Sequence, residues 1–332
     1  MNSRWKNLAV VALTALIALG VVEVGLRVFG IFPSVSGPPR YLARADLTQV
    51  YSLVPDGVWR HSSQEFNYTI RTNQNGFRGP DWNFDRPGIA ILGSSEVFGF
   101  GNAWADTFPA RLQSMVTDGG LDHQIRNMGV FGHNLLQVRD AFNRWKLHQR
   151  FAATVIQVDW RAVITSSTPS IFEVVDGYLV EVGRFPDGKL SPAYRIYGYS
   201  YSHSRAAAVF IDGVRRLMGP SNSDQTPQTA DAALSPDDIQ AAVRAAAIVD
   251  EIRIANGEKP FGVFLMAMER RQFDAMNTAL EARGIDVINT WNVSKQLGMS
   301  ARYPIDGHMT ADGNAIVAQS IGPWLRANLE QN

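Results

Sequence analysis

The chain of 332 residues carries 31 basic and 31 acidic side chains, so its formal net charge is zero. It has no basic cluster with interleaved aromatic residues, which argues against nucleic acid as a partner. It has no cysteine, which excludes disulfides, thiolate metal sites and a cysteine nucleophile. Hydrophobic residues make up 45% and charged residues 19%, values typical of a globular protein.

The N-terminus predicts one retained transmembrane helix within residues 1–34. Arg4 and Lys6 precede an apolar run at 8–22, which would cover only about 22 Å of a ~30 Å hydrocarbon core. The span must therefore continue toward Phe32. The alternative is a cleaved signal peptide, because Ala18-Leu19-Gly20 has small residues spaced as at a cleavage site.

Glu23 and Arg27 interrupt the apolar segment and can pair at i, i+4 on one helix face. We expect them where the helix end reaches water at the far interface; the other interpretation is contact with a partner membrane helix. The basic residues before the span favour an N-terminus inside and a C-terminal domain outside.

A linker is predicted at residues 35–44, followed by one domain over 45–330. Apolar and β-branched runs alternate with helix starts such as Ser235-Pro236 and the two acidic residues after it. This alternation predicts an α/β fold, with a parallel sheet covered by helices on both faces. In chain order we expect strands at 65–71, 88–92, 125–128, 152–158, 261–266 and 285–288. We expect helices at 107–116, 235–256 and 312–329, and a further helix that lies between the last two strands and ends at Gly284.

Insertions are expected near residues 165–235. Residues 178–182 followed by the turn Pro186-Asp187-Gly188 suggest a hairpin, and 219–233 suggest a mobile loop. Tyrosines 197, 199 and 201 alternate as on one face of a strand. With Tyr194 they suggest either a carbohydrate-binding surface or ordinary packing.

Three segments, far apart in the chain, carry the residue types that acyl transfer from an ester requires. Ser95 follows the apolar run at 88–92 and precedes a glycine-rich turn, where its hydroxyl could be a nucleophile. His308 has Asp306 two residues upstream, and a carboxylate beside an imidazole supports a general base. Gly132 and Asn134 lie in a loop that could offer donors to an oxyanion. Taken singly, each segment also reads as an ordinary turn.

The nucleophile elbow of α/β-hydrolases is not matched, because Val97 replaces its second glycine. The pattern resembles instead the SGNH (GDSL-like) hydrolases, most closely their membrane-anchored bacterial branch, over about residues 45–330. The segments that carry the resemblance are Asn73-Gln74-Asn75-Gly76-Phe77-Arg78, residues 91–99 with Gly93-Ser94-Ser95, Thr107-Phe108-Pro109, residues 127–132, and Asp306-Gly307-His308 with Gly313.

This resemblance implies a flavodoxin-like three-layer sandwich with about five parallel strands and no metal or organic cofactor. It implies that Ser95 is the nucleophile, His308 the base and Asp306 the supporting acid. The backbone N–H groups of Ser95 and Gly132 would be the oxyanion donors.

Three features depart from the family's pattern. Ser94 stands where an aspartate is usual, and one residue rather than two separates Asp306 from His308. Asp159 follows the strand at 152–158, where the family has its oxyanion asparagine, and an ionised carboxylate would repel an oxyanion. Losing one such donor costs about 2.7–4 kcal/mol of transition-state stabilisation. Asn134 and Arg161 are the candidates to replace it.

Two functions follow from these features. The first is a membrane-tethered serine esterase or O-acetyltransferase that acts on acylated carbohydrate. It would be a single-pass protein of the bacterial inner membrane with its C-terminal domain in the periplasm. The second is a catalytically silent scaffold subunit of a membrane protein complex, because the asparagine is missing. His308 within reach of Ser95 in an open cleft favours the enzyme, and a cleft filled by Trp160 or by residues 219–233 favours the scaffold.

Overall fold

The computed structural model describes residues 3–31, 43–146, 151–183, 188–217, 234–299 and 301–330. Contacts divide the chain into two compact units, one formed by residues 1–37, 62–67 and 190–227 and the other by the rest. Most of the predicted linker and all of the predicted loop at 219–233 lie outside the described residues.

The larger unit is built on a parallel sheet of four strands: β5 (Gly88–Gly93), β6 (Gln124–Gly129), β7 (Phe151–Asp159) and β10 (Phe261–Met266). Their order across the sheet is β10-β7-β5-β6. This is the flavodoxin-like order, in which the direction of winding reverses between the first and third strands, here β5 and β7.

The fifth strand expected at 285–288 is reduced to a single parallel bridge between Val263 and Val287. The side chain of Asn289 explains why the pairing stops there. Its Oδ1 accepts from Leu265 N at 2.8 Å and its Nδ2 donates to Leu265 O at 2.7 Å. Backbone bonds from Val263 N to Asp286 O and from Ile288 N to Val263 O still hold these residues beside β10. The predicted strand is therefore present only as a short parallel pairing, which the Asn289 side chain extends.

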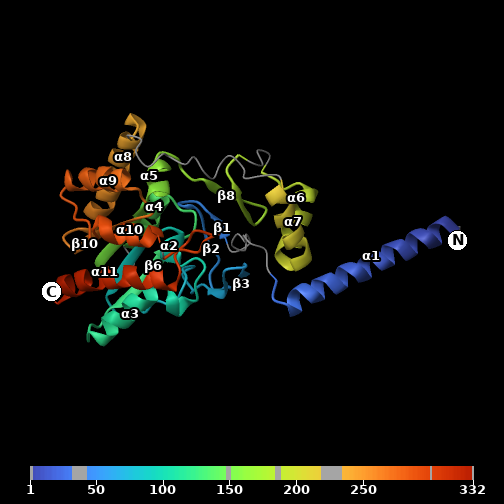
Figure 1. Ribbon diagram of the computed structural model, residues 1–332. Coiled ribbons are helices and arrows are strands. Elements are labelled where there is room, and N and C mark those ends of the chain that lie inside the picture. Colours follow the sequence, from blue (N-terminus) through green and yellow to red (C-terminus); the bar gives the residue numbers. More distant parts are fainter. Residues whose placement is uncertain are drawn as a thin grey trace. The chain divides into compact units, whose positions relative to one another are not determined.

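Helices cover both faces of this sheet, so the predicted three-layer α/β sandwich is confirmed (Figure 1). One layer holds α3 (Phe108–Asp118), α10 (Trp291–Met299) and α11 (Ala311–Leu329). The other holds α4 (Leu135–Lys146), α5 (Trp160–Ile164), α8 (Pro236–Asn256) and α9 (Arg270–Glu281). Between the sheet and the first layer lies a core in which Ile91, Phe108 and Val317 are fully buried.

Two helix starts predicted from the sequence are confirmed by the caps in the structure. Ser235 accepts from Asp238 N and forms a capping box at α8, and Gly257 follows the end of this helix. Thr107 caps α3 by accepting from Ala110 N. These local signals placed the helices well because a cap needs only residues three positions apart.

The described residues also form short two-stranded sheets beside the main sheet. Three two-stranded sheets pair β1 (Ala43–Asp46) with β2 (Val50–Leu53), β3 (Val58–Ser62) with β4 (Asn67–Arg71), and β8 (Phe172–Val175) with β9 (Tyr178–Glu181). The hairpin of β8 and β9 turns at Asp176-Gly177, both with positive φ, whereas Pro186 and Asp187 of the turn predicted from the sequence lie outside the described residues.

Outside residues 62–67, the helices in the described part of the smaller unit are α1 (Ser3–Val28), α6 (Pro192–His203) and α7 (Arg205–Leu217). The tyrosines expected on a strand therefore lie in α6, and that expectation is wrong. Ser191 caps this helix and Pro192 takes its first turn, so the same start signal as in α8 outweighs the alternation of aromatic residues.

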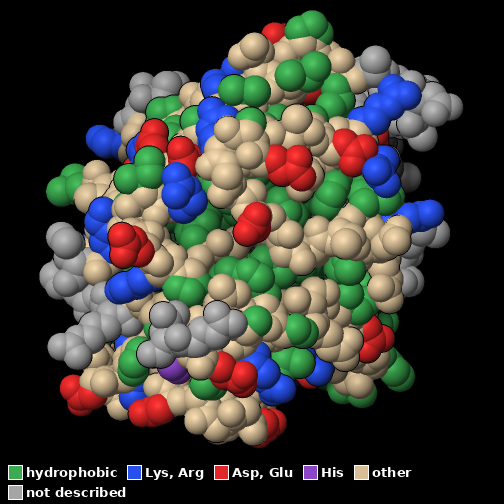
Figure 2. All heavy atoms as spheres, turned by 90° about the vertical axis from the view of Figure 1, so that its left-hand side faces the viewer, with side chains coloured by type: hydrophobic (Ala, Val, Ile, Leu, Met, Phe, Trp, Pro, Cys, Tyr) green, Lys and Arg blue, Asp and Glu red, His purple; other side chains and the backbone are tan. Residues whose placement is uncertain are grey.

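Among the described residues, one helix is long and apolar enough to cross a membrane, Arg4–Val28, with a mean hydropathy of 2.4. A signal sequence would have the same character. Glu23 pairs with Arg27 at 2.6 Å, as the i, i+4 spacing predicted. On the face of the molecule in Figure 2, acidic and basic side chains are interspersed, as the zero net charge leads one to expect.

Candidate active site

Ser95 lies at the carboxyl end of the sheet, beside the point where the winding reverses. It is the first residue of the short helix α2 (Ser95–Phe98), directly after β5. Gly93 turns the chain with φ near +156°, and a Cβ there would lie 2.5 Å from Val97 Cγ2. Open α/β sheets bind ligands at this position, so the hydroxyl stands where the fold builds a site.

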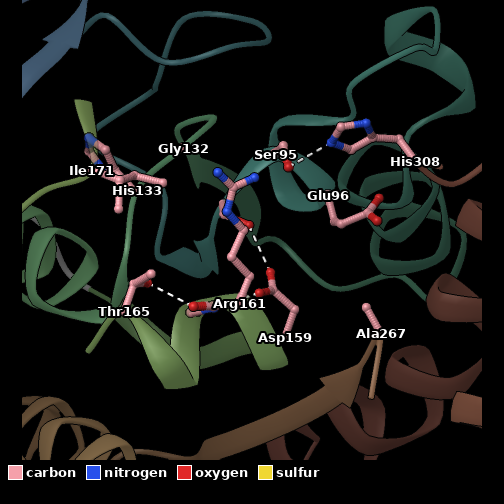
Figure 3. Close-up of a pocket in the computed structure, with 12 residues that line it drawn as sticks. Ser95, Glu96, Gly132, His133, Asp159, Arg161, Thr165, Ile171, Ala267 and His308 are labelled. Atoms are coloured by element: carbon pink, nitrogen blue, oxygen red, sulfur yellow. Dashed lines mark hydrogen bonds between the residues drawn. The ribbon is translucent and has the colours of Figure 1, made fainter. Parts of the chain in front are cut away.

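Ser95, His308 and Asp306 form one continuous hydrogen-bonded chain. His308 Nε2 lies 2.9 Å from Ser95 Oγ, and His308 Nδ1 lies 2.6 Å from Asp306 Oδ1 (Figure 3 draws the first of these contacts). The same carboxylate oxygen accepts from the backbone N of His308 at 3.3 Å. Gly307, with φ near +84°, makes the tight turn between them. One intervening residue is therefore enough for the carboxylate to reach the ring.

A second carboxylate, which the sequence did not single out, faces His308. Glu96 is buried, and its Oε1 lies 2.8 Å from Arg302 Nη1 while its Oε2 accepts from Met309 N at 3.2 Å. Burial lowers the pKa of His308, but the hydrogen bond with Asp306 and the charges of Glu96 and Asp306 outweigh this effect. The net result is a pKa above the ordinary value of the imidazole.

The loop after Ser95 is held by Arg78, a buried cation. Its guanidinium donates to the carbonyl oxygens of Phe98, Gly99 and Asn102. Asn102 Nδ2 in turn donates to Met309 O at 2.7 Å, which links the loop to the segment of His308. The sequence contained a signal for Arg78, since it closes the motif at 73–78, but nothing in that motif indicated its partners.

Two backbone N–H groups in the pocket remain available. Among the described residues, none accepts a hydrogen bond from the N–H of Ser95 or of Gly132. Gly132 has φ near +77°, and a Cβ there would lie 2.8 Å from Phe172 and from Tyr51 Oη. Gly132 lines the pocket, and a side chain at this position would collide with the neighbouring residues.

Asn134, the other residue of that loop considered as a donor, does not line the pocket. Its Nδ2 donates to Thr168 O at 2.6 Å and to Thr165 O at 3.3 Å. Since the amide is buried and engaged in holding the next loop, the expectation that Asn134 serves as an oxyanion donor finds no support in the geometry.

Asp159 and Ser94, two of the departures from the family's pattern, contact each other. Ser94 Oγ donates to Asp159 Oδ2 at 3.1 Å, and Gln157 Nε2 approaches the same oxygen at 3.3 Å. Asp159 Oδ1 accepts from Ala162 N at 2.8 Å and thereby caps α5. Each carboxylate oxygen thus has a donor, and a helix cap explains why an acidic residue is tolerated here.

Arg161 brings a positive charge to the same pocket. In Figure 3 its guanidinium projects from the start of α5 toward the side where Ser95 and Gly132 lie. Within the described parts of the chain its side chain has no hydrogen bond or ion pair. It is therefore a cation available to a bound group.

The pocket is open and has a volume of about 190 Å³. Trp160 is not among the residues that line it, and residues 219–233 lie outside the described chain. His133 contributes to the wall, and burial lowers its pKa to about 4, so it stays neutral at physiological pH. The lining residues are Ser94, Ser95, Glu96, Gly132, His133, Asp159, Arg161, Ala162, Thr165, Ile171, Ala267 and His308.

No protein-family model and no curated protein matches the chain. Solved structures do match it, with low identity. A lipase/acylhydrolase from Enterococcus faecalis is 10% identical over 73% of this chain and 96% of its own, with a TM-score of 0.40. A catalytic mutant of an acetylxylan esterase from Geobacillus stearothermophilus is 12% identical over 74% and 94%, with a TM-score of 0.37. A lipolytic protein of the G-D-S-L family from Veillonella parvula is 11% identical over 70% and 94%, with a TM-score of 0.37. The chain thus resembles lipolytic and esterase structures at a low level.

Proposed function

We propose that this protein is a serine esterase or O-acyltransferase of the SGNH type. One observation carries the proposal: Ser95 Oγ lies 2.9 Å from His308 Nε2, whose other nitrogen lies 2.6 Å from Asp306, in an open pocket. A nucleophile, a base and an orienting carboxylate in this order activate a hydroxyl for acyl transfer.

In the proposed reaction Ser95 Oγ attacks the ester carbonyl carbon while His308 Nε2 takes its proton. The N–H groups of Ser95 and Gly132 donate to the oxyanion, and Arg161 offers a cationic third contact in place of the asparagine. His308 then returns the proton to the leaving alkoxide as the C–O bond breaks, which leaves an acyl-serine. Water or a sugar hydroxyl, deprotonated by His308, attacks this ester; the acyl–Oγ bond breaks, and His308 returns the proton to Ser95 Oγ.

We propose small acyl esters of carbohydrate as the substrate class. The pocket volume of about 190 Å³ is below the range of about 300–1,000 Å³ that is typical of drug-sized ligands, which supports a small acyl group. We further propose that α1 anchors the chain in a bacterial inner membrane with the catalytic unit in the periplasm, on the basis of its apolar length and of Arg4 and Lys6 before it.

One observation favours a catalytically silent scaffold subunit as the second candidate. Asp159 places a carboxylate in the pocket at the position expected to donate to the oxyanion. Its oxygens accept from Ser94 and Ala162, so they cannot themselves donate.

Acetate release from an acetylated oligosaccharide distinguishes the two candidates. Wild-type protein is expected to release acetate, and Ser95→Ala is expected to lower the rate by about 10³-fold or more. Ser114→Ala removes an exposed hydroxyl on α3 and serves as the matched control, with an unchanged rate expected. If Ser95→Ala releases acetate as fast as wild type, the proposal fails. An added unacetylated oligosaccharide that becomes acetylated identifies a transferase.

A further inference from the structure

Glu23, an acidic residue near the end of the apolar helix α1, makes contacts that its pairing with Arg27 does not account for. Its Oε1 accepts from Arg205 N at 3.2 Å, and its Oε2 accepts from Ala206 N at 2.9 Å and from Ser204 Oγ at 2.9 Å. Arg205 and Ala206 are the first two residues of α7. The first N–H groups of a helix have no partner within it, so the Glu23 carboxylate caps α7 from another helix.

The joint between these helices is reinforced by a second set of contacts. Ser204 Oγ accepts from Ala207 N at 3.2 Å, while Arg205 Nη1 donates to Leu26 O at 3.2 Å. The start of α7 is thus fixed to the last turns of α1 by hydrogen bonds running in both directions. Helix α6 packs against α7 in the same unit.

The position of the joint sets the depth of α7 if α1 spans a bilayer. Glu23 lies five residues before Val28, the last residue of α1, which is about 7.5 Å along the axis at about 1.5 Å per residue. The headgroup layer on each side of the hydrocarbon core is about 5–8 Å thick. With Arg4 at one edge of the ~30 Å hydrocarbon core, Glu23 lies about 28 Å further along the axis, so the N-terminus of α7 lies at the level of the opposite headgroups, where a charged carboxylate is tolerated.

The two helices present apolar side chains that the described residues of their own unit leave exposed. Phe210 is 71% exposed and Ile196 is 67% exposed. Phe210 and Val214 stand at i, i+4 on one face of α7, whereas Ala208 on another face is buried. An amphipathic helix with arginines and aromatic residues nearby is typical of elements that lie in a membrane interface.

We propose that α6 and α7 form an interfacial membrane-binding element, with Phe210 and Val214 directed into the acyl chains of the bilayer and Glu23 as the joint that holds α7 at this depth. The occupant of the apolar face is lipid, because the element is tied to the end of the helix that would cross the membrane. The proposal rests on the membrane anchor in the proposed function and is independent of the catalytic chemistry.

Lipid quenching in the full-length protein, reconstituted in bilayers that contain an anionic lipid, tests this proposal. Because the chain has no cysteine, single-cysteine variants can carry one environment-sensitive fluorophore each. Phe210→Cys is the test position. Leu13→Cys in the middle of α1 reports on the anchor, and Ile254→Cys, 65% exposed on α8 of the other unit, is the exposed control.

The probe at Phe210→Cys is expected to be quenched by nitroxide lipids about twofold or more above that at Ile254→Cys, and to be shielded from aqueous iodide. If Leu13→Cys is not quenched by lipid, the anchor itself is wrong. If Leu13→Cys is quenched but Phe210→Cys behaves like Ile254→Cys, the interfacial element is wrong although the anchor stands. Shielding of Phe210→Cys from both quenchers would indicate a protein partner and would also overturn the proposal.

The role of Glu23 is tested in the Phe210→Cys background. Glu23→Ala removes all acceptors for α7 and is expected to lower lipid quenching toward the level of Ile254→Cys. Glu23→Gln retains one acceptor oxygen and is expected to keep more of the quenching. If both variants quench like the parent, Glu23 is not the joint.

Discussion

The carboxylates of Asp306 and Glu96 both raise the pKa of His308, and this gives the proposed reaction a defined pH dependence. Its pKa lies above the ordinary value of about 6.5, so a larger share of the imidazole is protonated at neutral pH and cannot act as a base. We expect kcat/KM for ester hydrolysis to rise with pH through an apparent pKa above about 6.5. Glu96→Gln removes one negative charge and should move this rise to lower pH, as measured by a pH–rate profile of both proteins. An unmoved profile in a variant of unchanged thermal stability would show that Glu96 does not act on His308.

Asp159 is the residue where the site differs most from the pattern it resembles. Asp159→Asn keeps a side chain that caps α5, since asparagine and aspartate cap equally well, and it introduces an N–H₂ donor in the pocket. If the carboxylate opposes the oxyanion, kcat/KM should rise, by up to about 10²-fold for a well-placed donor. Asp159→Ala, which loses cap and charge together, is the control for the effect on stability. A fall in activity in Asp159→Asn would mean that the carboxylate itself takes part in the reaction.

At the scale of elements, the loop after β6 is shaped by Gly132. Gly132→Ala places a Cβ in a left-handed backbone position and within 2.8 Å of Phe172 and Tyr51 Oη, so the loop must move. Gly120→Ala is a matched control, because its φ is near +74° but nothing lies within 4 Å of the added Cβ. We expect Gly120→Ala to cost about 1–2 kcal/mol of unfolding free energy without loss of activity. Gly132→Ala should cost more and also lower kcat/KM. Equal activities of the two variants would remove Gly132 from the proposed site.

The elements that the sequence predicted correctly are those with local signals. Ser235 with Pro236, and Thr107 with Pro109, mark helix starts because capping joins residues only a few positions apart. The tyrosines of α6 alternate as on a strand, but they lie in a helix because Ser191 and Pro192 form a helix start directly before them. The strand expected at 285–288 is shorter than predicted for a non-local reason, since beyond Ile288 the side chain of Asn289, and not its backbone, pairs with β10.

At the scale of the whole molecule, a parallel sheet brings together residues that lie more than 200 positions apart. Ser95 and His308 were predictable as a pair because each stands in a recognisable motif. Glu96 and Arg302 are just as close to each other, but no pattern within either segment indicates the contact. The winding reversal between β5 and β7 explains why Ser95 and Asp159 share one pocket, since both follow strands at that point.

The most direct test of the account is whether Ser95 is an activated nucleophile. Full-length protein would be treated with a fluorophosphonate probe, with wild type, Ser95→Ala and His308→Ala side by side, and the adduct would be located by mass spectrometry. If His308 activates Ser95, we expect an adduct on Ser95 in wild type that is absent from Ser95→Ala and strongly reduced in His308→Ala. Folded wild-type protein that forms no adduct would contradict the account and favour the silent scaffold.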